Sequence, residues 1–136
     1  MISRTRKFLI IEDEEPIRGI LTAFVERYAM ENVQHFRPKT MALEDSVRGL
    51  FELSQSGEDY SAVLLDVRLP RMTGDEVFAA LETANPAILD RVIFITGYSD
   101  DLDNRFPNVD LKILEKPFKY KEFSNMLDRV MNTATV

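Results

Sequence analysis

Short apolar runs alternate with longer amphipathic stretches along the chain. Four of these runs, at residues 8–11, 62–65, 91–95 and 111–114, are rich in apolar side chains. Such runs are typical of strands that are covered on both faces, as the strands of a parallel sheet are. We therefore predict a strand at each of the four runs.

The stretch between the first two runs carries apolar residues at helical spacing. This pattern predicts a helix from Pro16 to about Tyr28 and a second helix over residues 40–54. Proline suits the first turn of a helix, where its missing N–H group costs nothing. Residues 33–36, which Pro38 would close, form a weak candidate for a further strand.

Helical spacing returns in the second half of the chain. It predicts a helix around residues 77–81 and a closing helix around residues 123–130. Between the last two strands Pro107 cuts the pattern short, so we expect a short or irregular fourth helix within residues 97–110. Residues 55–59 suggest an extended loop before the next strand.

The alternation of strands and helices defines the expected fold class. It predicts an α/β protein with a doubly wound parallel sheet and helices on both faces. The chain has 136 residues and shows no repeat or linker, so we expect one domain over residues 1–136. Its termini, at residues 1–6 and 132–136, are expected to be loose.

The composition excludes several classes of protein. The chain has no cysteine, which excludes disulfides, thiolate metal sites and cysteine nucleophiles, and its one histidine, His35, excludes a multi-histidine metal site. The formal net charge of −6 argues against a nucleic-acid surface. No apolar stretch is long enough to span a membrane, and the run at residues 8–11 is too short for a signal peptide, so we expect a cytoplasmic protein.

Polar side chains follow the predicted strands at the point where each strand ends. Glu12 and Asp13 follow the first strand, Asp66 the second, Thr96 the third and Lys116 the last. Because ligands of open α/β sheets bind beyond the carboxyl ends of the strands, these side chains are expected to gather at one edge. Each of them alone has an ordinary explanation, as a capping, turn or solvated residue, so the prediction depends on their combination.

The combination predicts a particular chemistry. Clustered carboxylates repel one another unless a cation lies among them, and Mg²⁺ prefers oxygen ligands and commonly bridges to a phosphate. An aspartate beside such an ion can act as a nucleophile toward a phosphoryl group, while a lysine and a hydroxyl group orient the phosphoryl oxygens. The residues therefore predict a site for the phosphorylation of Asp66.

Four segments, at residues 10–14, 64–74, 95–97 and 115–118, resemble the motifs of a known family and follow one another in the family's order. They are similar to the acidic pair, the phosphoacceptor segment, the switch threonine and the lysine–proline–aromatic element of the receiver domain of two-component response regulators, the domain that chemotaxis regulators also have. The resemblance spans nearly the whole chain. It implies a flavodoxin-like, five-stranded parallel sheet of order 2-1-3-4-5 flanked by helices.

The resemblance also implies roles for the acidic residues. Asp66 would accept a phosphoryl group from a histidine kinase or a histidine phosphotransfer protein. Asp13, Asp66 and the backbone carbonyl of Arg68 would bind Mg²⁺, and Glu12 would reach the ion directly or through water. A domain of this kind is a phosphoacceptor with self-assisted phosphotransfer and autodephosphorylation, so we do not expect a turnover enzyme.

Two further residues would respond to the phosphoryl group. Lys116, beside an expected cis peptide bond to the following proline, would pair with the phosphoryl oxygens, and Thr96 would swing toward them. The family often has an aromatic residue three places before this lysine, where this chain has Ile113. Tyr98 or Phe118 could report the change instead, and Ile113 is expected to be an ordinary core residue of the strand.

The sequence also suggests how the domain passes on its signal and which other functions remain to be considered. Little sequence follows the closing helix, so we expect either output through a downstream protein in trans or a chain that is a piece of a longer protein, such as a hybrid kinase. We expect no nucleic-acid or membrane partner. The alternative is a pseudo-receiver that acts as a phosphorylation-independent interaction module, against which the intact Asp13, Asp66, Thr96 and Lys116 argue. A metal-dependent phosphohydrolase of another doubly wound family is disfavoured, because such enzymes commonly carry a second acid where this chain has Arg68.

Overall fold

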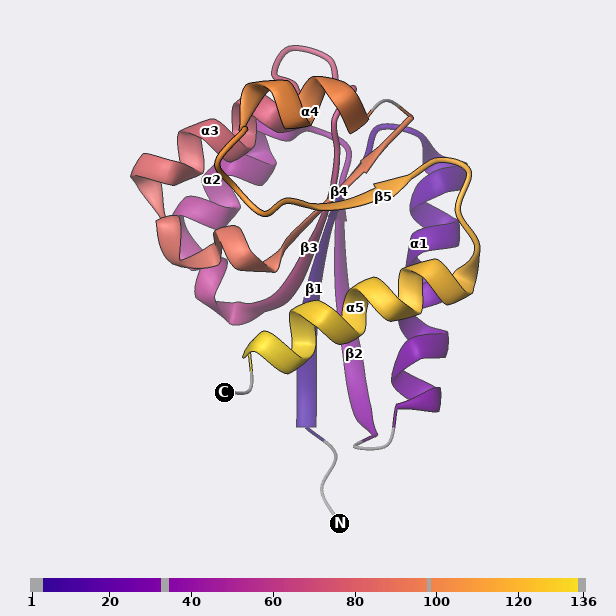
Figure 1. Ribbon diagram of the computed structural model, residues 1–136. Coiled ribbons are helices and arrows are strands. Elements are labelled where there is room, and N and C mark those ends of the chain that lie inside the picture. The colour runs from indigo at the N-terminus through magenta and orange to yellow at the C-terminus, as the bar shows by residue number, and fades with distance from the viewer. Residues whose placement is uncertain (1–3, 33–34, 98, 135–136) are drawn as a thin grey trace.

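The computed structural model describes residues 4–32, 35–97 and 99–134, and in this part of the chain it shows one sheet with helices on both faces (Figure 1). The five described strands are parallel and follow the order β2-β1-β3-β4-β5, which confirms the expected doubly wound fold. The strands are β1 (Arg4–Ile11), β2 (Phe36–Leu43), β3 (Tyr60–Asp66), β4 (Val92–Thr96) and β5 (Lys112–Glu115).

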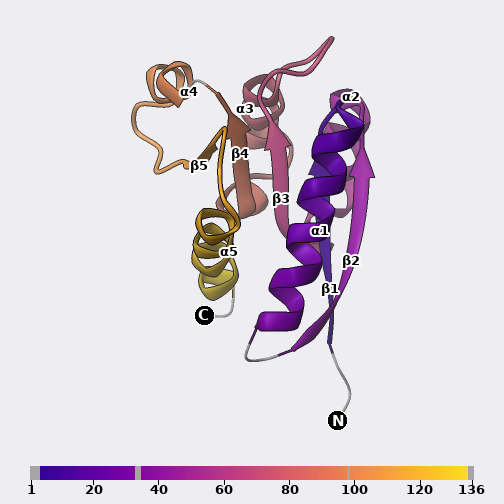
Figure 2. The ribbon, with the colours of Figure 1, turned by 90° about the vertical axis from the view of Figure 1, so that its right-hand side faces the viewer.

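Helices connect the strands and cover the sheet. The α-helices are α1 (Glu15–Glu31), α2 (Ser46–Ser56), α3 (Gly74–Ala84), α4 (Ser99–Arg105) and α5 (Tyr120–Ala134). Two short 3₁₀ helices of the described chain, η1 (Gly57–Asp59) and η2 (Pro86–Arg91), lead into β3 and β4. Figure 2 looks onto the face that α1 and α5 cover, whereas α2 and α3 pack on the opposite face.

Alternate residues of β1 enter two separate cores. Phe8 and Ile10 pack on the side of α1 and α5, whereas Leu9 and Ile11 pack on the side of α2 and α3. All four side chains are fully buried. Because the side chains of a strand alternate between the faces of the sheet, a strand that is covered on both sides must be apolar at every position, and this explains the continuous runs in the sequence.

Most predicted elements are confirmed to within a few residues, but the second strand is an exception. The sequence pattern predicts it at residues 33–36, whereas β2 begins at Phe36 and continues through Pro38 to Leu43. Proline is tolerated there because β2 is an edge strand, whose outer N–H groups have no neighbouring strand to pair with. Residues 33 and 34 lie outside the described part of the chain.

The second helix and the loop after it also differ from the prediction. The expected helix over residues 40–54 begins only at Ser46, because the Asp45 side chain accepts hydrogen bonds from two backbone N–H groups of the first turn. The expected extended loop at residues 55–59 is wrong as well. The helix continues to Ser56, and η1 then leads directly into β3.

Some of the terminal residues that were expected to be loose belong to a strand or a helix. Residues 4–6 belong to β1, because they pair with β2 from Arg4 onward, where Arg4 lies opposite Phe36. At the other end, α5 extends to Ala134. The remaining terminal residues, 1–3 and 135–136, lie outside the described part of the chain.

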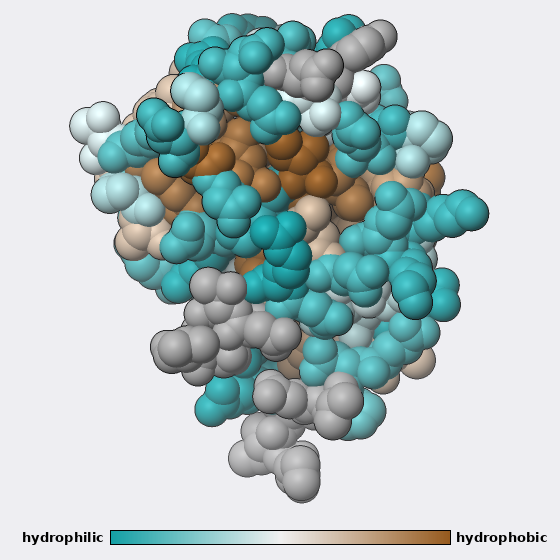
Figure 3. Space-filling view, viewed as in Figure 1, coloured by the Kyte–Doolittle hydropathy of each residue, from teal (hydrophilic) through white to brown (hydrophobic). Residues whose placement is uncertain are grey.

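The fourth helix is short, as predicted. It has seven residues and ends two positions before Pro107. An ion pair between Arg105 and Asp75 connects it to the start of α3, and a hydrogen bond from Ser99 to Glu115 connects it to the end of β5. Figure 3 shows hydrophobic surface below this helix, on the face where the open edge of β5 lies.

Candidate functional site

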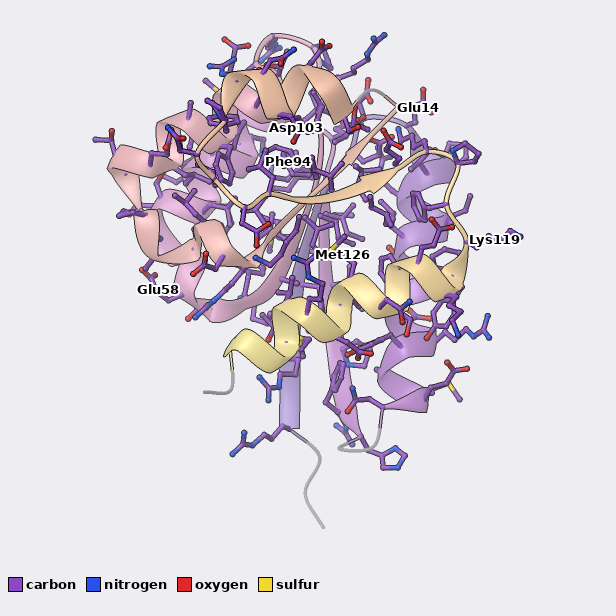
Figure 4. All side chains as sticks on the ribbon, in the orientation of Figure 1. Glu14, Glu58, Phe94, Asp103, Lys119 and Met126 are labelled. Atoms are coloured by element: carbon purple, nitrogen blue, oxygen red, sulfur yellow. The ribbon has the colours of Figure 1, made fainter. Side chains whose placement is uncertain are left out.

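Three carboxylates meet at the carboxyl ends of β1 and β3. Ile11 lies opposite Leu65 in the sheet, so Glu12 and Asp13 emerge beside Asp66. One carboxylate oxygen from each of these three acidic residues lies within 4.8 Å of the others. Glu12 and Asp66 are buried, with exposed fractions of 1% and 5%, whereas Asp13 is exposed. Figure 4 labels the neighbouring Glu14 at this edge of the sheet.

Lys116 brings a positive charge to the carboxylates. Its Nζ atom lies 3.8 Å from Asp66 Oδ1 and 3.9 Å from Glu12 Oε1, and both distances are too long for a hydrogen bond. The lysine follows directly after β5 and precedes a cis peptide bond to Pro117, as the sequence predicts. Glu12, Asp13 and Lys116, from distant parts of the chain, therefore converge on Asp66.

Thr96 lies at the buried end of the neighbouring strand. It is the last residue of β4, with 2% of its surface exposed. Its carbonyl oxygen accepts a hydrogen bond of 2.8 Å from the backbone N–H of Lys116, and the carbonyl of Ile95 accepts one of 3.1 Å from Val67. The end of β4 is thus hydrogen-bonded to the residue after Asp66 and to Lys116. A shift of this strand end would therefore displace both of these segments.

The carboxyl group of Glu12 is in an unfavourable position for a negative charge. Its two oxygens are buried, and neither has a hydrogen-bond partner among the described residues. Burial, and after it the nearby Asp66, raise the pKa of Glu12 to about 9, although the Lys116 ammonium group acts in the opposite direction. A buried carboxylate without hydrogen-bond partners, with one oxygen within 4.8 Å of an oxygen of each of two other carboxylates, is well suited to receive a cation.

The turn after Asp66 is held by a close approach of α3. The backbone N–H of Arg68 donates a hydrogen bond of 3.2 Å to Asp66 Oδ1, and the Gly74 N–H donates one of 2.8 Å to the carbonyl of Val67. A Cβ atom on Gly74 would lie 2.9 Å from the Cα atom of Val67 and closer still to the carbonyl oxygen of Asp66. Only glycine fits this contact without a shift of the backbone.

The sequence assigns no role to two residues that help to position the backbone of the site. The first is Gly74, which the phosphoacceptor segment contains but whose close approach to Asp66 depends on the packing of α3. The second is Arg18 of α1, which donates a hydrogen bond of 2.9 Å from Nη1 to the carbonyl oxygen of Glu12. Nothing in the sequence indicates the contact of Arg18, because it joins a helix surface to a backbone atom six residues away.

Ile113 behaves as an ordinary core residue of β5. It packs, partly buried, against the core on the side of α2 and α3. Phe118 lies on the other side of the sheet, where its ring packs edge-on against Phe24 at a centroid distance of 6.2 Å. Tyr98, the other aromatic residue considered for the switch, lies outside the described part of the chain.

The fold and the site agree with one protein family. Residues 8–128 match the model of the response regulator receiver domain, and this chain belongs to that family. In the part of the chain that the structure describes, no helix has the length and apolar character that a membrane span requires.

Curated relatives are longer than this chain. The transcriptional regulatory protein TcrA of Mycobacterium tuberculosis is 29% identical over 117 residues, which cover 76% of this chain and 42% of the relative. An uncharacterized response regulatory protein of Shewanella oneidensis is 32% identical over 73 residues, which cover 54% of this chain and 30% of the relative. The chain thus spans less than half the length of the curated relatives that it matches.

Solved structures share the fold. A response regulator receiver domain protein from Clostridium thermocellum superposes with a TM-score of 0.78 at 17% identity and covers 96% of this chain and 97% of its own. The receiver domain of the sensor histidine kinase PA1611 from Pseudomonas aeruginosa, solved with a magnesium ion in its active-site cleft, gives a TM-score of 0.76 at 18% identity and covers 94% and 98%. At these identities the likeness concerns the fold.

Proposed function

We propose that this receiver domain is phosphorylated on Asp66 and that the phosphoryl group changes which partner it binds. The observation that carries this proposal is the position of Asp66. An oxygen of its buried carboxylate lies within 4.8 Å of an oxygen of Glu12 and of Asp13, and its Oδ1 atom lies 3.8 Å from Lys116 Nζ. Such a site combines a nucleophile with groups that can neutralise the charge of an incoming phosphoryl group.

The donor in this proposal is a phosphohistidine of a histidine kinase or a histidine phosphotransfer protein. An oxygen of Asp66 forms a bond to phosphorus while the phosphorus–nitrogen bond to the imidazole breaks, and the imidazole takes up a proton as it leaves. Lys116 lies where its ammonium group can pair with the transferred phosphoryl oxygens. The domain is itself the acceptor in this step, so it acts as a signalling module and not as a turnover enzyme.

A divalent cation fits the site. Glu12, Asp13 and Asp66 offer a set of oxygen ligands only, and neither carboxylate oxygen of Glu12 has a hydrogen-bond partner among the described residues. Mg²⁺ matches this donor set and would offset the charge that develops on the phosphoryl oxygens. The solved receiver domain of PA1611 holds magnesium in its active-site cleft, which supports the proposal. The backbone carbonyl of Arg68, two residues after Asp66, completes the proposed set.

The output step depends on the segment after β4. A phosphoryl group adds about −1.5 to −2 charges and new acceptor oxygens, which the hydroxyl group of Thr96 and the ammonium group of Lys116 can satisfy. Because Thr96 leads toward α4, its movement would reposition this short helix. The hydrophobic surface below α4 is then where a downstream protein in trans would bind (Figure 3). Both the donor and this partner are expected in the cytoplasm.

The second candidate is a pseudo-receiver that binds partners without phosphorylation. Ile113 at the usual aromatic position and the short α4 favour it, whereas the intact acidic cluster and Lys116 favour the phosphorylated form.

A titration separates the two candidates. The backbone amide resonances of the full chain are followed by NMR while Mg²⁺ and beryllium fluoride, a mimic of the phosphoryl group, are added. The phosphorylated receiver predicts saturable shifts near Asp66 and Thr96 that require both reagents, and Asp66→Asn should remove them. Absence of any saturable shift in the unaltered chain would favour the pseudo-receiver and overturn the proposal.

A further inference from the structure

A pocket lies at the amino ends of β1 and β3, at the opposite end of these strands from the acidic cluster. Its volume is about 370 Å³, and it is lined by residues 4–7 of β1, residues 58–61 at the start of β3, and Arg91 at the end of η2. Figure 1 shows that β1 extends beyond the start of β3, and pairing between the two strands begins only at Lys7. The first residues of β1, which pair with β2 but not with β3, therefore form one wall of the pocket.

The lining of this pocket is basic in an acidic protein. Four of its side chains are cationic and two, those of Glu58 and Asp59, are carboxylates, so the local formal charge is four minus two, or +2, against −6 for the chain. Among the described residues, none of the four cations lies within 4.0 Å of a carboxylate oxygen. The cations are Arg4, Arg6, Lys7 and Arg91.

Two of the cations are held in place by the protein. Arg91 Nη1 donates hydrogen bonds of 3.0 Å and 2.8 Å to the carbonyl oxygens of Glu58 and Tyr60. Lys7 Nζ lies 4.7 Å from the centre of the Tyr60 ring, which is fully buried. The charges of Lys7 and Arg91 are thus in place before any ligand arrives, and such preorganisation lowers the cost of binding.

We propose that this pocket binds a small phosphate monoester whose organic part carries hydroxyl groups, such as a sugar phosphate. A phosphate monoester carries about −1.5 to −2 charges at neutral pH, which matches the local excess of +2, and guanidinium groups pair well with phosphate oxygens. Carboxylates accept hydrogen bonds but cannot donate them, so Glu58 and Asp59 select for hydroxyl donors next to the phosphate. The volume lies within the usual range for small-molecule sites.

Other anionic ligands fit less well. A nucleobase would need an aromatic surface for stacking, but the one aromatic side chain that lines the pocket in the described structure, Tyr60, is buried beneath Lys7. A nucleic-acid backbone would meet the negative field of a chain with a net charge of −6 outside this small area. A concave site with hydroxyl acceptors favours a small, compact ligand.

The binding test uses the full chain without Mg²⁺. A hexose 6-phosphate, the parent hexose and inorganic phosphate are titrated separately while backbone amide resonances are followed by NMR. We expect saturable shifts at residues 4–7, 58–61 and 91 with the hexose phosphate, none with the hexose, and about tenfold weaker binding of inorganic phosphate because it lacks the hydroxyl contacts. Equal affinity for both phosphates, shifts confined to residues 12, 13 and 66, or no saturation would each overturn the proposal.

A pair of charge-reversal variants tests the residues. Arg4→Glu with Arg6→Glu should weaken binding of the hexose phosphate by about tenfold or more, because two charge-assisted contacts are replaced by repulsion. Arg37→Glu with Lys39→Glu, on the neighbouring strand and outside the pocket, makes the same change in net charge and should have little effect. Equal weakening by both pairs would overturn the proposal. Should the first pair fail to fold, Arg4→Glu alone, at an exposed position, provides the same comparison.

Discussion

Gly74, the first residue of α3, lies against the backbone carbonyl of Asp66, the last residue of β3. The contact is closer than any side chain permits, and it involves backbone atoms that cannot rotate away. The helix start is fixed by a capping box between Thr73 and Glu76. The position of the proposed phosphoacceptor therefore depends on how α3 begins.

This contact predicts the effect of Gly74→Ala. The added methyl group must displace the turn after Asp66, so the variant should lose about 1–3 kcal/mol of unfolding free energy and bind Mg²⁺ more weakly. Gly19→Ala is the matched control, because a Cβ atom at that exposed helical position meets nothing within 4 Å and should stabilise the chain by about 0.5–1 kcal/mol. Urea denaturation and a Mg²⁺ titration measure both effects. Equal behaviour of the two variants would contradict the account.

The raised pKa of Glu12 predicts how stability changes with pH. A carboxyl group whose pKa is higher in the folded chain, here about 9, than in the unfolded chain favours folding most at low pH. Without Mg²⁺, the unfolding free energy should therefore fall as the pH rises from about 5 to 9. Saturating Mg²⁺ should reverse this fall, because the cation stabilises the ionised form.

Glu12→Gln tests this assignment. The variant should lose the decline with pH and be more stable than the unaltered chain at neutral pH without Mg²⁺, because glutamine does not ionise and brings no negative charge beside Asp66. Glu14→Gln removes an exposed carboxylate two residues away and should leave the pH profile unchanged. The unfolding free energy of both variants is measured from denaturation curves at several pH values. If it still falls with rising pH in Glu12→Gln, a group other than Glu12 causes the fall.

Lys116 should act on phosphorylation more than on metal binding. Its ammonium group competes with a cation for Asp66 and Glu12, so Lys116→Ala should bind Mg²⁺ at least as tightly as the unaltered chain. The rate of labelling by a small phosphodonor should fall by about 10²-fold, since a charge that stabilises the transition state is removed. Lys119→Ala, at an exposed position, is the control. A large loss of Mg²⁺ affinity in Lys116→Ala would be inconsistent with this role.

The ion pair between Arg105 and Asp75 should hold α4 in place. It is partly exposed and contributes less than about 1 kcal/mol to global stability, so Arg105→Ala should change the denaturation midpoint little. Hydrogen exchange of the backbone amides in α4 should nevertheless become faster, because the ion pair joins the end of this seven-residue helix to the start of α3. Arg105→Lys keeps the charge and should restore most of the protection. Unchanged exchange in Arg105→Ala would show that other contacts position the helix.

The sequence was most informative where strands are buried on both faces. The continuous run at residues 8–11 predicts β1 because its side chains enter two cores, and the polar residue after each such run marks the site. The edge strand β2 was misplaced, because only one of its eight side chains is buried and Pro38 resembles a strand end. Leu43 shares helical spacing with residues of α2, so the pattern did not separate the strand from the helix.

The sequence predicts some features of the site, whereas others depend on three-dimensional packing. The acidic cluster and Lys116 could be predicted, because strand order alone brings the carboxyl ends of neighbouring strands together. The contact of Arg18 with the Glu12 carbonyl depends on the orientation of α1. The absence of hydrogen-bond partners for the Glu12 oxygens, among the described residues, is likewise a property of packing that no spacing in the sequence encodes.

Covalent labelling tests the central claim most directly. The unaltered chain and Asp66→Asn are incubated with a small phosphodonor, with and without Mg²⁺, and their intact masses and proteolytic fragments are measured. We expect one added phosphoryl group on the fragment that contains Asp66, only with Mg²⁺, and none in Asp66→Asn. Labelling of Asp66→Asn to the same extent, or labelling that does not depend on Mg²⁺, would contradict the account.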